Sequence, residues 1–339
     1  MLYKKLVSIY LVVAVVLLCA SHATAQKKYV FESAKMGSPF TVTICANDSL
    51  KAAYIAHAAF AKADTLNSIL SDYIDSSEIN RLSATSGQGR YVKVSPELYN
   101  ILKASLKAAV LSNGSYDVTI GPVVKLWRRA RKSKVFPSKD SIAAALECVG
   151  YKYLHLDSVT RSVWLEKPGM MLDIGGLGKG YVAQIALDLI ARAGYPSAMV
   201  NAGGKIVIGD APPGTQGWII GINVPGEKQA VMQQLLLLKN TAIATSGDIY
   251  QYLDFNGKRY SHIVNPKTGI GLTHSANVTA IAAGGATADW LATACSILSP
   301  RKAMALIKLF PNGARLITQK KNEAIKHRQS PGFKNFVLK

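Results

Sequence analysis

The sequence predicts a mixed α+β fold in which one or more sheets pack against helices. Runs typical of strands and runs typical of amphipathic helices are interspersed along the 339 residues, without the regular strand–helix–strand alternation of a doubly wound sheet. The chain also shows no internal repeat and no low-complexity segment. Its length suffices for one large domain or two modest ones, and we expect residues 26–339 to form a single one.

The first elements are two strands and a long helix. The alternating pattern of residues 29–44 indicates two strands, joined by the turn Met36-Gly-Ser-Pro39. An Ala-rich apolar stripe predicts a helix over 49–70. Ser76 or Ser77 can then cap a short helix.

In the middle of the chain, Pro and Gly residues mark where helices begin and end. Ser95-Pro96-Glu97 starts a helix that is expected to end before Asn113-Gly114, and Gly121-Pro122 leads into a shorter one. The basic residues of 128–134 are typical of a solvated surface segment. We also expect a helix at 138–149 and strands at 91–94, 153–156, 162–166 and 170–174.

The C-terminal half is predicted to be rich in strands. Asn256-Gly257 marks a hairpin turn between two of them. The expected strands are 198–200, 206–208, 218–222, 235–238, 250–255, a return strand from 258, 277–282 and a terminal pair; the expected helices are 287–298 and 300–309.

The stretch from Met171 to Gln184 carries the strongest functional signal. Asp173 stands at the end of a short apolar run, and four glycines follow within six residues, with Lys179 among them, before a helical pattern over 181–193. Such a turn exposes backbone N–H groups at the positive end of a helix dipole, which suits a phosphate. The spacing fits neither the Walker A loop nor the dinucleotide fingerprint. A tight turn whose glycines serve geometry alone is the alternative.

Residues 1–25 read as a secretory signal peptide. Lys4 and Lys5 precede an apolar run, and Ala23-Thr-Ala25 forms a cleavage site, so the mature chain is expected to begin at Gln26 and to be periplasmic. The apolar run is shorter than a membrane span. A lipid anchor on Cys19 is the less favoured alternative, because a leucine rather than a small residue precedes it.

The formal net charge of +20 falls by two when Lys4 and Lys5 are removed. This balance favours anionic partners such as nucleotides or a phospholipid surface, unless the charge merely solvates the protein. Export and the lack of a basic helix interleaved with aromatic residues argue against nucleic acid.

The three cysteines that remain after cleavage are Cys45, Cys148 and Cys295. They are scattered and odd in number, which favours buried apolar residues over a zinc site or a disulfide framework.

Asp289 and Thr293 form a second candidate site. They are four residues apart on a predicted helix and therefore share a face. With a backbone carbonyl from elsewhere they would make an oxygen-only set suited to Mg²⁺. The alternative is an ordinary helix in which Asp289 interacts with the dipole and Thr293 with the preceding turn.

Three further residues have two interpretations each. His262 lies in a Ser-His-Ile-Val-Asn-Pro turn, where a histidine is either a structural hydrogen-bonding residue or a base. Met36 and Tyr73 lie in turns, where they either stack on a flat ligand or fill space.

Nine ordered motifs together resemble the ApbE family of FAD:protein FMN transferases, over nearly the whole mature chain. The motifs are Met36-Gly-Ser-Pro39, Ser71-Asp-Tyr73, Ser77-Glu-Ile-Asn80, Tyr116-Asp-Val-Thr119 with Gly121-Pro122, Leu172-Asp-Ile-Gly-Gly-Leu-Gly-Lys-Gly-Tyr181, Asn201-Ala-Gly-Gly204, Ala244-Thr-Ser-Gly-Asp248, His262-Ile-Val-Asn-Pro-Lys-Thr-Gly269 and Ala288-Asp-Trp-Leu-Ala-Thr-Ala294. The resemblance implies an ApbE-like fold with a flavin nucleotide in a central cleft. It also implies an enzyme that moves FMN from FAD, its substrate, onto a Thr or Ser hydroxyl and releases AMP.

The resemblance also implies site roles. Asp173 and Lys179 would contact FAD, and the Gly176 carbonyl would join Asp289 and Thr293 on Mg²⁺. His262 is the candidate base for the acceptor hydroxyl, and Asp289 acts in catalysis through the metal. The residues implied to line the flavin and adenosine pockets are Met36, Tyr73, Thr119, Ile120, Gly121 and Ile263. The implied partner is an electron-transfer flavoprotein that carries a Thr/Ser flavinylation motif.

Two positions depart from the family pattern. Asn265 replaces the usual Asp, and Lys205 follows Gly203-Gly204 where an acidic or amide residue is common. Both changes make the site less negative. Two alternatives to the transferase stay open: an Mg²⁺-dependent FAD pyrophosphatase that yields FMN and AMP, and a secreted flavin-binding protein without catalysis.

Overall fold

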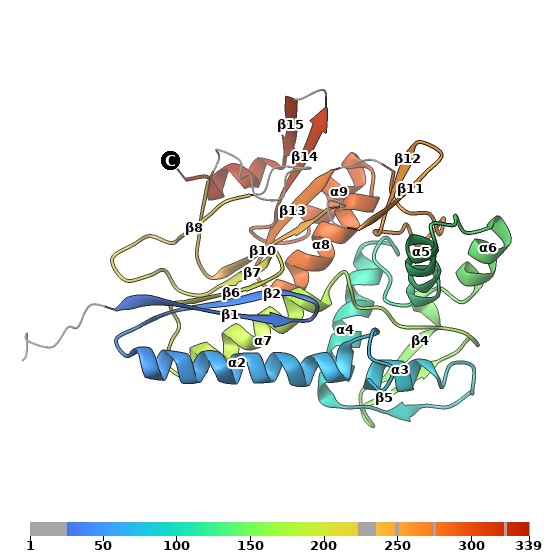
Figure 1. Cartoon of the computed structure of the whole chain (residues 1–339), viewed down its shortest axis with the longest axis horizontal. Helices are drawn as coiled ribbons and strands as arrows, with labels where there is room; N and C mark the ends of the chain where they lie inside the picture. Colours follow the sequence, from blue (N-terminus) through green and yellow to red (C-terminus); the bar gives the residue numbers. More distant parts are fainter. Residues whose placement is uncertain (1–25, 223–234, 248–250, 274–275, 322–323, 339) are drawn as a thin grey trace, which may run out of the picture.

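The computed structural model describes residues 26–222, 235–247, 251–273, 276–321 and 324–338. The predicted signal peptide lies outside these residues. No helix among those described is both long and apolar enough to cross a membrane. Figure 1 shows a large twisted sheet with helices on one side and a smaller group of helices and short strands at one end.

The large sheet has eight strands and is antiparallel at every pairing. Its spatial order is β1 (Lys27–Lys35), β2 (Ser38–Ala46), β6 (Ala198–Ala202), β7 (Lys205–Ile208), β10 (Thr241–Ser246), β13 (Asn277–Ala282), β14 (Ala314–Lys321) and β15 (Ala324–Gln329). Strands from both halves of the chain therefore form one sheet, with β1 and β15 at its edges.

Helices cover one face of this sheet, where the main hydrophobic core lies. The helices that contribute to this core are α2 (Ser49–Leu70), α4 (Pro96–Leu111), α7 (Gly178–Arg192), α8 (Gly285–Ile297) and α9 (Pro300–Ile307), with the short α3 (Glu78–Ser83) beside α2. In Figure 1, α2 and α7 run beneath the β1–β2 hairpin, and α8 lies along β10 and β13. A second core on the opposite face involves β8 (Trp218–Ile220), β9 (Leu236–Leu238) and the 3₁₀ helix η2 (Pro331–Phe336).

The smaller group of elements lies beside α4. The strands β3 (Val92–Lys93), β5 (Ser162–Leu165) and β4 (Leu154–Asp157) form a three-stranded sheet, and the 3₁₀ turn η1 (Tyr151–Tyr153) precedes β4. A third core joins the helix α5 (Gly121–Ser133) to the hairpin β11 (Tyr252–Phe255) and β12 (Lys258–Ser261), and α6 (Lys139–Glu147) packs against α5.

Local signals placed several helices correctly. The helix α2 has the predicted bounds, with Asp48 as its N-cap. Ser77 caps α3 and Ser95 caps α4, each through a hydrogen bond from a first-turn N–H to its hydroxyl oxygen. After α4, Asn113 and Gly114 adopt positive φ angles of 50° and 71°, which end the helix.

Other predictions were wrong. The apolar run 170–174 is not a strand, because it meets residues 118–121 through the single parallel bridge Ile120–Met171. The run 128–134 is not merely a solvated segment: α5 continues through it and buries Ala130. The strands expected at 218–222 and 235–238 do form, as β8 and β9 of a separate two-stranded sheet, whereas residues 241–246, which the expected strands did not include, form β10 of the large sheet.

The cysteine prediction holds at two of three positions. Cys45 and Cys295 are buried free thiols, whereas Cys148 is only half-buried. Burial raises the pKa of the Cys295 thiol to about 12, so it is protonated at neutral pH.

Candidate functional site

The helices α7 and α8 cross at glycines. The crossing brings together the two candidate sites of the sequence, the Gly-rich turn and the Asp289–Thr293 pair. A Cβ atom on Gly180 of α7 would lie 2.1 Å from the carbonyl oxygen of Gly285 of α8, and a Cβ on Gly285 would lie 2.1 Å from the oxygen of Gly180. Only glycine permits this approach. The N–H of Gly285 also donates to Gln184 Oε1 at 3.0 Å, which ties the start of α8 to α7.

The crossing places Asp289 against the first turn of α7. The Gly180 N–H donates to Asp289 Oδ2 at 3.0 Å, so the carboxylate binds one of the N–H groups at the positive end of that helix. Asp289 is only 1% exposed. Burial raises the pKa of its carboxyl, while the positive charges of Lys205 and Lys179 oppose that shift.

Thr293 joins Asp289 to the Gly-rich turn. Its Oγ1 donates to the Asp289 carbonyl oxygen one turn earlier at 3.2 Å and lies 3.4 Å from the Gly176 carbonyl oxygen. A Cβ on Gly176 would lie 3.0 Å from Thr293 Cγ2, so the glycine allows this contact. Thr293 therefore connects Asp289, one turn earlier, to the Gly176 carbonyl. The ApbE resemblance implies that these three residues hold Mg²⁺, and that role stays a prediction.

These oxygens form a donor set that fits Mg²⁺. Among the residues that the structure describes, no cluster of three or more His, Cys, Asp or Glu side chains could hold a metal ion, so a thiolate or imidazole site is not indicated there. One carboxylate with two neutral oxygens suits a hard cation that completes its shell with water and phosphate oxygens.

Two lysines lie near this carboxylate. Lys179 belongs to the first turn of α7, and its Nζ would lie 3.4 Å from a Cβ on Gly203, which has a positive φ of 58°. Lys205 begins β7, and its Nζ donates to the Thr245 carbonyl oxygen at 2.9 Å. Burial, and then the charge of Lys205, lower the pKa of Lys179. Two ammonium groups next to a helix N-terminus suit a diphosphate.

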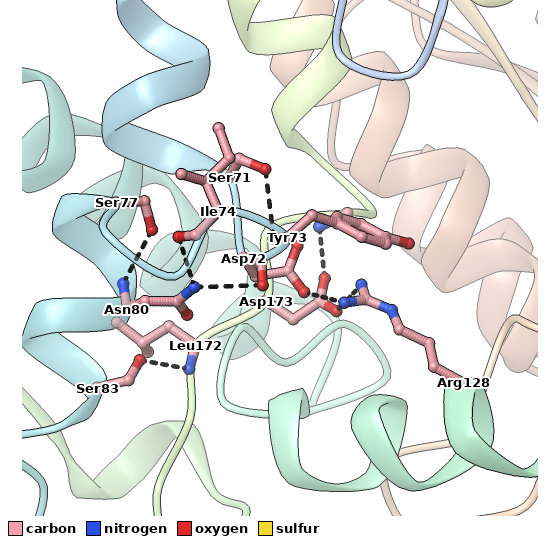
Figure 2. A network of polar contacts seen from close by, with 11 residues as sticks. Ser71, Asp72, Tyr73, Ile74, Ser77, Asn80, Ser83, Arg128, Leu172 and Asp173 are labelled. Carbon is pink, nitrogen blue, oxygen red and sulfur yellow. Dashed lines mark hydrogen bonds and ion pairs between the residues drawn. The ribbon is translucent and has the colours of Figure 1, made fainter.

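A second part of the site lies around Asp173, as Figure 2 shows. Asp173 Oδ1 accepts the Gly175 N–H at 2.7 Å, which fixes the turn before α7. Its Oδ2 accepts from Arg128 Nη2 at 3.1 Å, and Arg128 Nη1 pairs with Asp72. The Arg128 guanidinium also lies over the Tyr73 ring, with Cζ 3.9 Å from the ring centroid.

The environment of Asp173 shifts its ionisation. Burial, and then the nearby Asp72 carboxylate, raise the pKa of Asp173 from 3.8 to about 6, although the Arg128 charge opposes this shift. The carboxyl is therefore ionised at neutral pH and becomes protonated in mildly acidic solution.

The family follows from a comparison of the whole chain. The family model described as the ApbE family matches residues 36–317. The chain belongs to the ApbE family. That match includes the Gly-rich turn, the α7–α8 crossing and the surroundings of Asp173.

Relatives in the ApbE family carry a common name. A protein from Klebsiella pneumoniae (strain 342) named FAD:protein FMN transferase is 28% identical over 314 residues, which are 91% of this chain and 89% of that protein. A protein of the same name from Treponema pallidum (strain Nichols) is 30% identical over 276 residues and 75% of each chain.

Solved ApbE structures have the same fold. The flavinyl transferase ApbE of Pseudomonas stutzeri in its apo form has a TM-score of 0.80 at 25% identity, covering 92% of this chain and 97% of that one. The ApbE protein of Thermotoga maritima has a TM-score of 0.81 at 28% identity, covering 92% and 100%. The predicted α+β, ApbE-like fold is confirmed.

The ApbE motif around residues 117–121 is bonded to the segment that carries Asp173. Thr119 is fully buried, and its hydroxyl donates to Asp117 Oδ1 at 2.7 Å and accepts the Gly150 N–H at 2.8 Å. The Gly121 N–H donates to the Met171 carbonyl oxygen, and a Cβ on Gly121 would lie 2.5 Å from that oxygen. The Thr119 side chain therefore holds the backbone, and Ile120 beside it is half-buried.

The other pocket residues implied by the ApbE resemblance lie in turns. Met36 sits in the β1–β2 turn with a positive φ of 51° and packs partly against the main core. His262 and Ile263 follow β12: His262 Nδ1 lies 3.1 Å from the Gln251 carbonyl oxygen, and Ile263 is buried. The roles assigned to these three residues stay predictions.

The two departures from the ApbE pattern have different consequences. Asn265 Oδ1 accepts the Lys267 N–H at 3.0 Å, a turn-capping bond that an aspartate would make equally well. Asn265 also lines a cavity of about 310 Å³ with Phe136 and Tyr260. Lys205, in contrast, adds its charge beside Asp289.

Sequence reasoning missed Arg128 and Asp72. Asp72 belongs to the motif Ser71-Asp-Tyr73 but received no role there, and Arg128 lies in a basic run that resembles solvated charge. A signal for Arg128 existed: Val123, Trp127 and Ala130 continue the buried stripe of α5 through the basic run, which puts Arg128 at its edge.

Proposed function

We propose that this chain is an FAD:protein FMN transferase, which moves FMN from FAD to a hydroxyl of an acceptor protein and releases AMP. Membership of the ApbE family and the shared name of its relatives support this activity. The observation that carries the proposal is the α7–α8 crossing. It joins Asp289, Thr293 and the Gly176 carbonyl to a helix N-terminus flanked by Lys179.

Magnesium is part of this proposal. Asp289, Thr293 and the Gly176 carbonyl would hold it, because their oxygens match its preferences, and water and phosphate oxygens would complete its shell. When bound, Mg²⁺ would neutralise charge on the diphosphate and so make its phosphorus a better electrophile.

The residues of the chain do the remaining work. Lys179, Lys205 and the N–H groups of the first turn of α7 stabilise the negative charge that develops on the phosphates. The acceptor hydroxyl attacks the phosphorus on the FMN side, and the bond to AMP breaks. Asp173 and Tyr73 bind the nucleotide away from the reacting phosphorus.

His262 takes the proton of the acceptor hydroxyl in this scheme. A carbonyl oxygen can only accept a hydrogen bond, so the contact with Gln251 assigns the proton of the neutral ring to Nδ1. The basic nitrogen is then Nε2.

The acceptor in this proposal is an electron-transfer flavoprotein with a Thr or Ser in a flavinylation motif. Its encounter with the enzyme takes place in the periplasm, because residues 1–25 have the features of a signal peptide. The excess of Lys and Arg favours association with an anionic membrane surface.

Mass spectrometry tests the activity. Residues 26–339 are incubated with FAD, MgCl₂ and a protein that one of the named relatives flavinylates. We expect the acceptor to gain the mass of FMN while AMP is released, and both to be lost with EDTA. An acceptor with Val in place of the reactive Thr is the control.

Other products would contradict the transferase. FMN and AMP without a labelled acceptor would identify a pyrophosphatase, and intact bound FAD would identify a flavin carrier. The location is tested separately, by mass spectrometry of the protein from cells that express the whole gene. An N-terminus at Gln26 is expected, whereas retained Lys4, or lipid on Cys19, would contradict it.

A further inference from the structure

Arg128 lies under an aromatic ring that stays accessible. Tyr73 follows α2, and its side chain is among the large apolar groups on the surface, with 69% of the residue exposed. The Arg128 guanidinium stacks on it from α5, 3.9 Å from the ring centroid (Figure 2). One face of the ring is therefore supported, and most of the rest can meet a flat ligand.

Two carboxylates fix the guanidinium itself. Arg128 Nη1 pairs with Asp72 and Nη2 with Asp173, so the planar fork is held at two points. The loop that carries Asp72 and Tyr73 is fixed as well, since Asn80 Nδ2 donates to the carbonyl oxygens of Asp72 at 3.2 Å and Ile74 at 2.9 Å. Figure 2 shows Asn80 on one side of this loop and the Arg128 guanidinium on the other, beside the Tyr73 ring.

The same network reaches the Gly-rich turn. Asp173 Oδ1 accepts the Gly175 N–H at 2.7 Å, and the carbonyl oxygen of the following residue, Gly176, lies 3.4 Å from Thr293 Oγ1. The path from the Tyr73 ring through Arg128 and Asp173 therefore ends at the turn that carries one of the proposed metal ligands.

We propose that Arg128 is a positioning residue for the flavin nucleotide. It holds the Tyr73 ring as a flat stacking surface and joins that surface to the Gly-rich turn through Asp173. The ring system and the phosphates of FAD then bind to two surfaces, the Tyr73 ring and the Gly-rich turn, that are already held in place relative to each other. This role rests on the proposed function, since it assumes that FAD is the ligand. Preorganisation of this kind acts on binding more than on the chemical step.

Arg128 also affects the charge of Asp173. The charged groups that act on this carboxyl are Asp72, which raises its pKa, and Arg128, which lowers it. The Tyr73 and Tyr116 hydroxyls are near enough for the Asp173 charge to raise their pKa values. Removal of Arg128 leaves Asp173 beside Asp72 without a counter-ion. FAD binding that needs an ionised Asp173 should then fail at a higher pH than in the wild type.

The test compares Arg128→Gln, Arg128→Lys and, as a matched control, Arg129→Gln. Arg129 is the next residue of the same helix and carries the same charge, but it is exposed. FAD affinity is measured by flavin fluorescence between pH 5 and pH 8, FMN transfer by steady-state kinetics, and folding by thermal unfolding.

For Arg128→Gln we expect the Kd and KM for FAD to rise about tenfold, because a stacked cation and its ion pairs are lost. The kcat should change by less than about threefold, since the proposed metal ligands are intact. The acid midpoint of FAD binding should move to higher pH. Arg128→Lys should restore the midpoint but not the affinity, because lysine keeps the charge without the planar fork. Arg129→Gln should match the wild type.

Unchanged Kd and acid midpoint in Arg128→Gln would overturn the proposal while leaving the transferase intact. A lower kcat together with a lower unfolding temperature, with no shift in the acid midpoint of FAD binding, would also overturn it. Arg128 would then have a purely structural role. A wild-type chain that neither binds FAD nor transfers FMN would instead refute the proposed function.

Discussion

At the α7–α8 crossing the site is built from backbone and small residues, whereas around Tyr73 it is built from long side chains on separate elements. The crossing joins Gly180 to Gly285 and leaves Asp289 almost fully buried. The Tyr73 surface depends on Arg128, which reaches across from α5 to a loop and to Asp173. Close backbone contact tolerates almost no change, while a side-chain network can be altered one group at a time.

This difference separates two kinds of function. Phosphate and metal chemistry needs donors fixed within a fraction of an ångström, which backbone contacts provide. Recognition of a flat ring needs an aromatic surface of defined orientation, which a stacked guanidinium can provide. We therefore expect changes at the crossing to affect catalysis and folding, and changes around Tyr73 to affect affinity and its pH dependence.

The strongest test of this contrast removes the charge at the crossing. Asp289→Asn should lower the rate of FMN transfer by about 10²–10³-fold, because an amide gives the metal no charge. The free energy of unfolding should stay the same or rise, since a buried carboxylate without a metal is destabilising. Initial rates of AMP release at saturating FAD and Mg²⁺, with urea unfolding, provide the measurement. A rate within tenfold of the wild type would show that Asp289 is not a metal ligand.

The second test separates packing at the crossing from helix propensity. Gly180→Ala should lower the free energy of unfolding by about 3 kcal/mol, because the new methyl group meets the Gly285 carbonyl. Gly178→Ala is the control within the same helix, since its Cβ would meet the Ile174 side chain, with Cδ1 nearest at 2.7 Å, and no backbone atom. That change should cost less than about 1 kcal/mol. Equal effects in urea unfolding would mean that the crossing is not tightly packed.

The third test concerns the pH dependence of stability at the Tyr73 end. The pKa of Asp173 is raised from 3.8 to about 6, so the folded chain binds this proton more tightly than the unfolded chain. The resulting stability is fully present below about pH 3.8 and is lost as the pH rises through about 6. The free energy of unfolding of Asp173→Asn should therefore rise by about 1 kcal/mol or more, relative to that of the wild type, between pH 4.5 and pH 7.5.

Urea unfolding at the two pH values measures this change. The same substitution at Asp254, an exposed residue, controls for the loss of one carboxylate. A difference between Asp173→Asn and the wild type that is constant with pH would mean that Asp173 titrates as an ordinary carboxyl.

The smallest effect is expected outside both ends of the site. Asn265→Asp restores the residue that the ApbE motif usually has and keeps the oxygen that accepts the Lys267 N–H. Stability should change by less than about 0.5 kcal/mol, as for a surface substitution that keeps its bond. Asn265→Ala, which removes the acceptor, should cost about 1 kcal/mol. A large loss of transfer in Asn265→Asp would show that the charge at this position matters to the reaction.

The elements that sequence placed well are those with local signals. The bounds of α2 and α4 followed from an apolar stripe, from Ser95-Pro96 and from Asn113-Gly114, all within one segment. The Asp289–Thr293 pair was identified for the same reason, because one helical turn separates the two residues.

Contacts between distant segments were not accessible in this way. The run 170–174 is apolar like a strand, but it meets 118–121 only through the isolated bridge Ile120–Met171 and the bond from the Asp173 N–H to the Val118 carbonyl oxygen at 2.8 Å. Arg128 lies 56 residues from Asp72 and 45 from Asp173 in the sequence, so no local spacing pattern predicts these ion pairs. Long side chains that converge from separate elements are specified by the tertiary fold.

The bond from the Gly180 amide to the Asp289 carboxylate has a practical consequence. An amide proton bonded directly to a carboxylate is deshielded in proportion to the negative charge that it meets. A cation that binds Asp289 withdraws part of that charge, so the ¹H and ¹⁵N resonances of Gly180 will move as the cation is added. Because α8 covers this amide, its exchange with solvent should also be slow. A single backbone position thus reports on cation occupancy without any added label on the ligand.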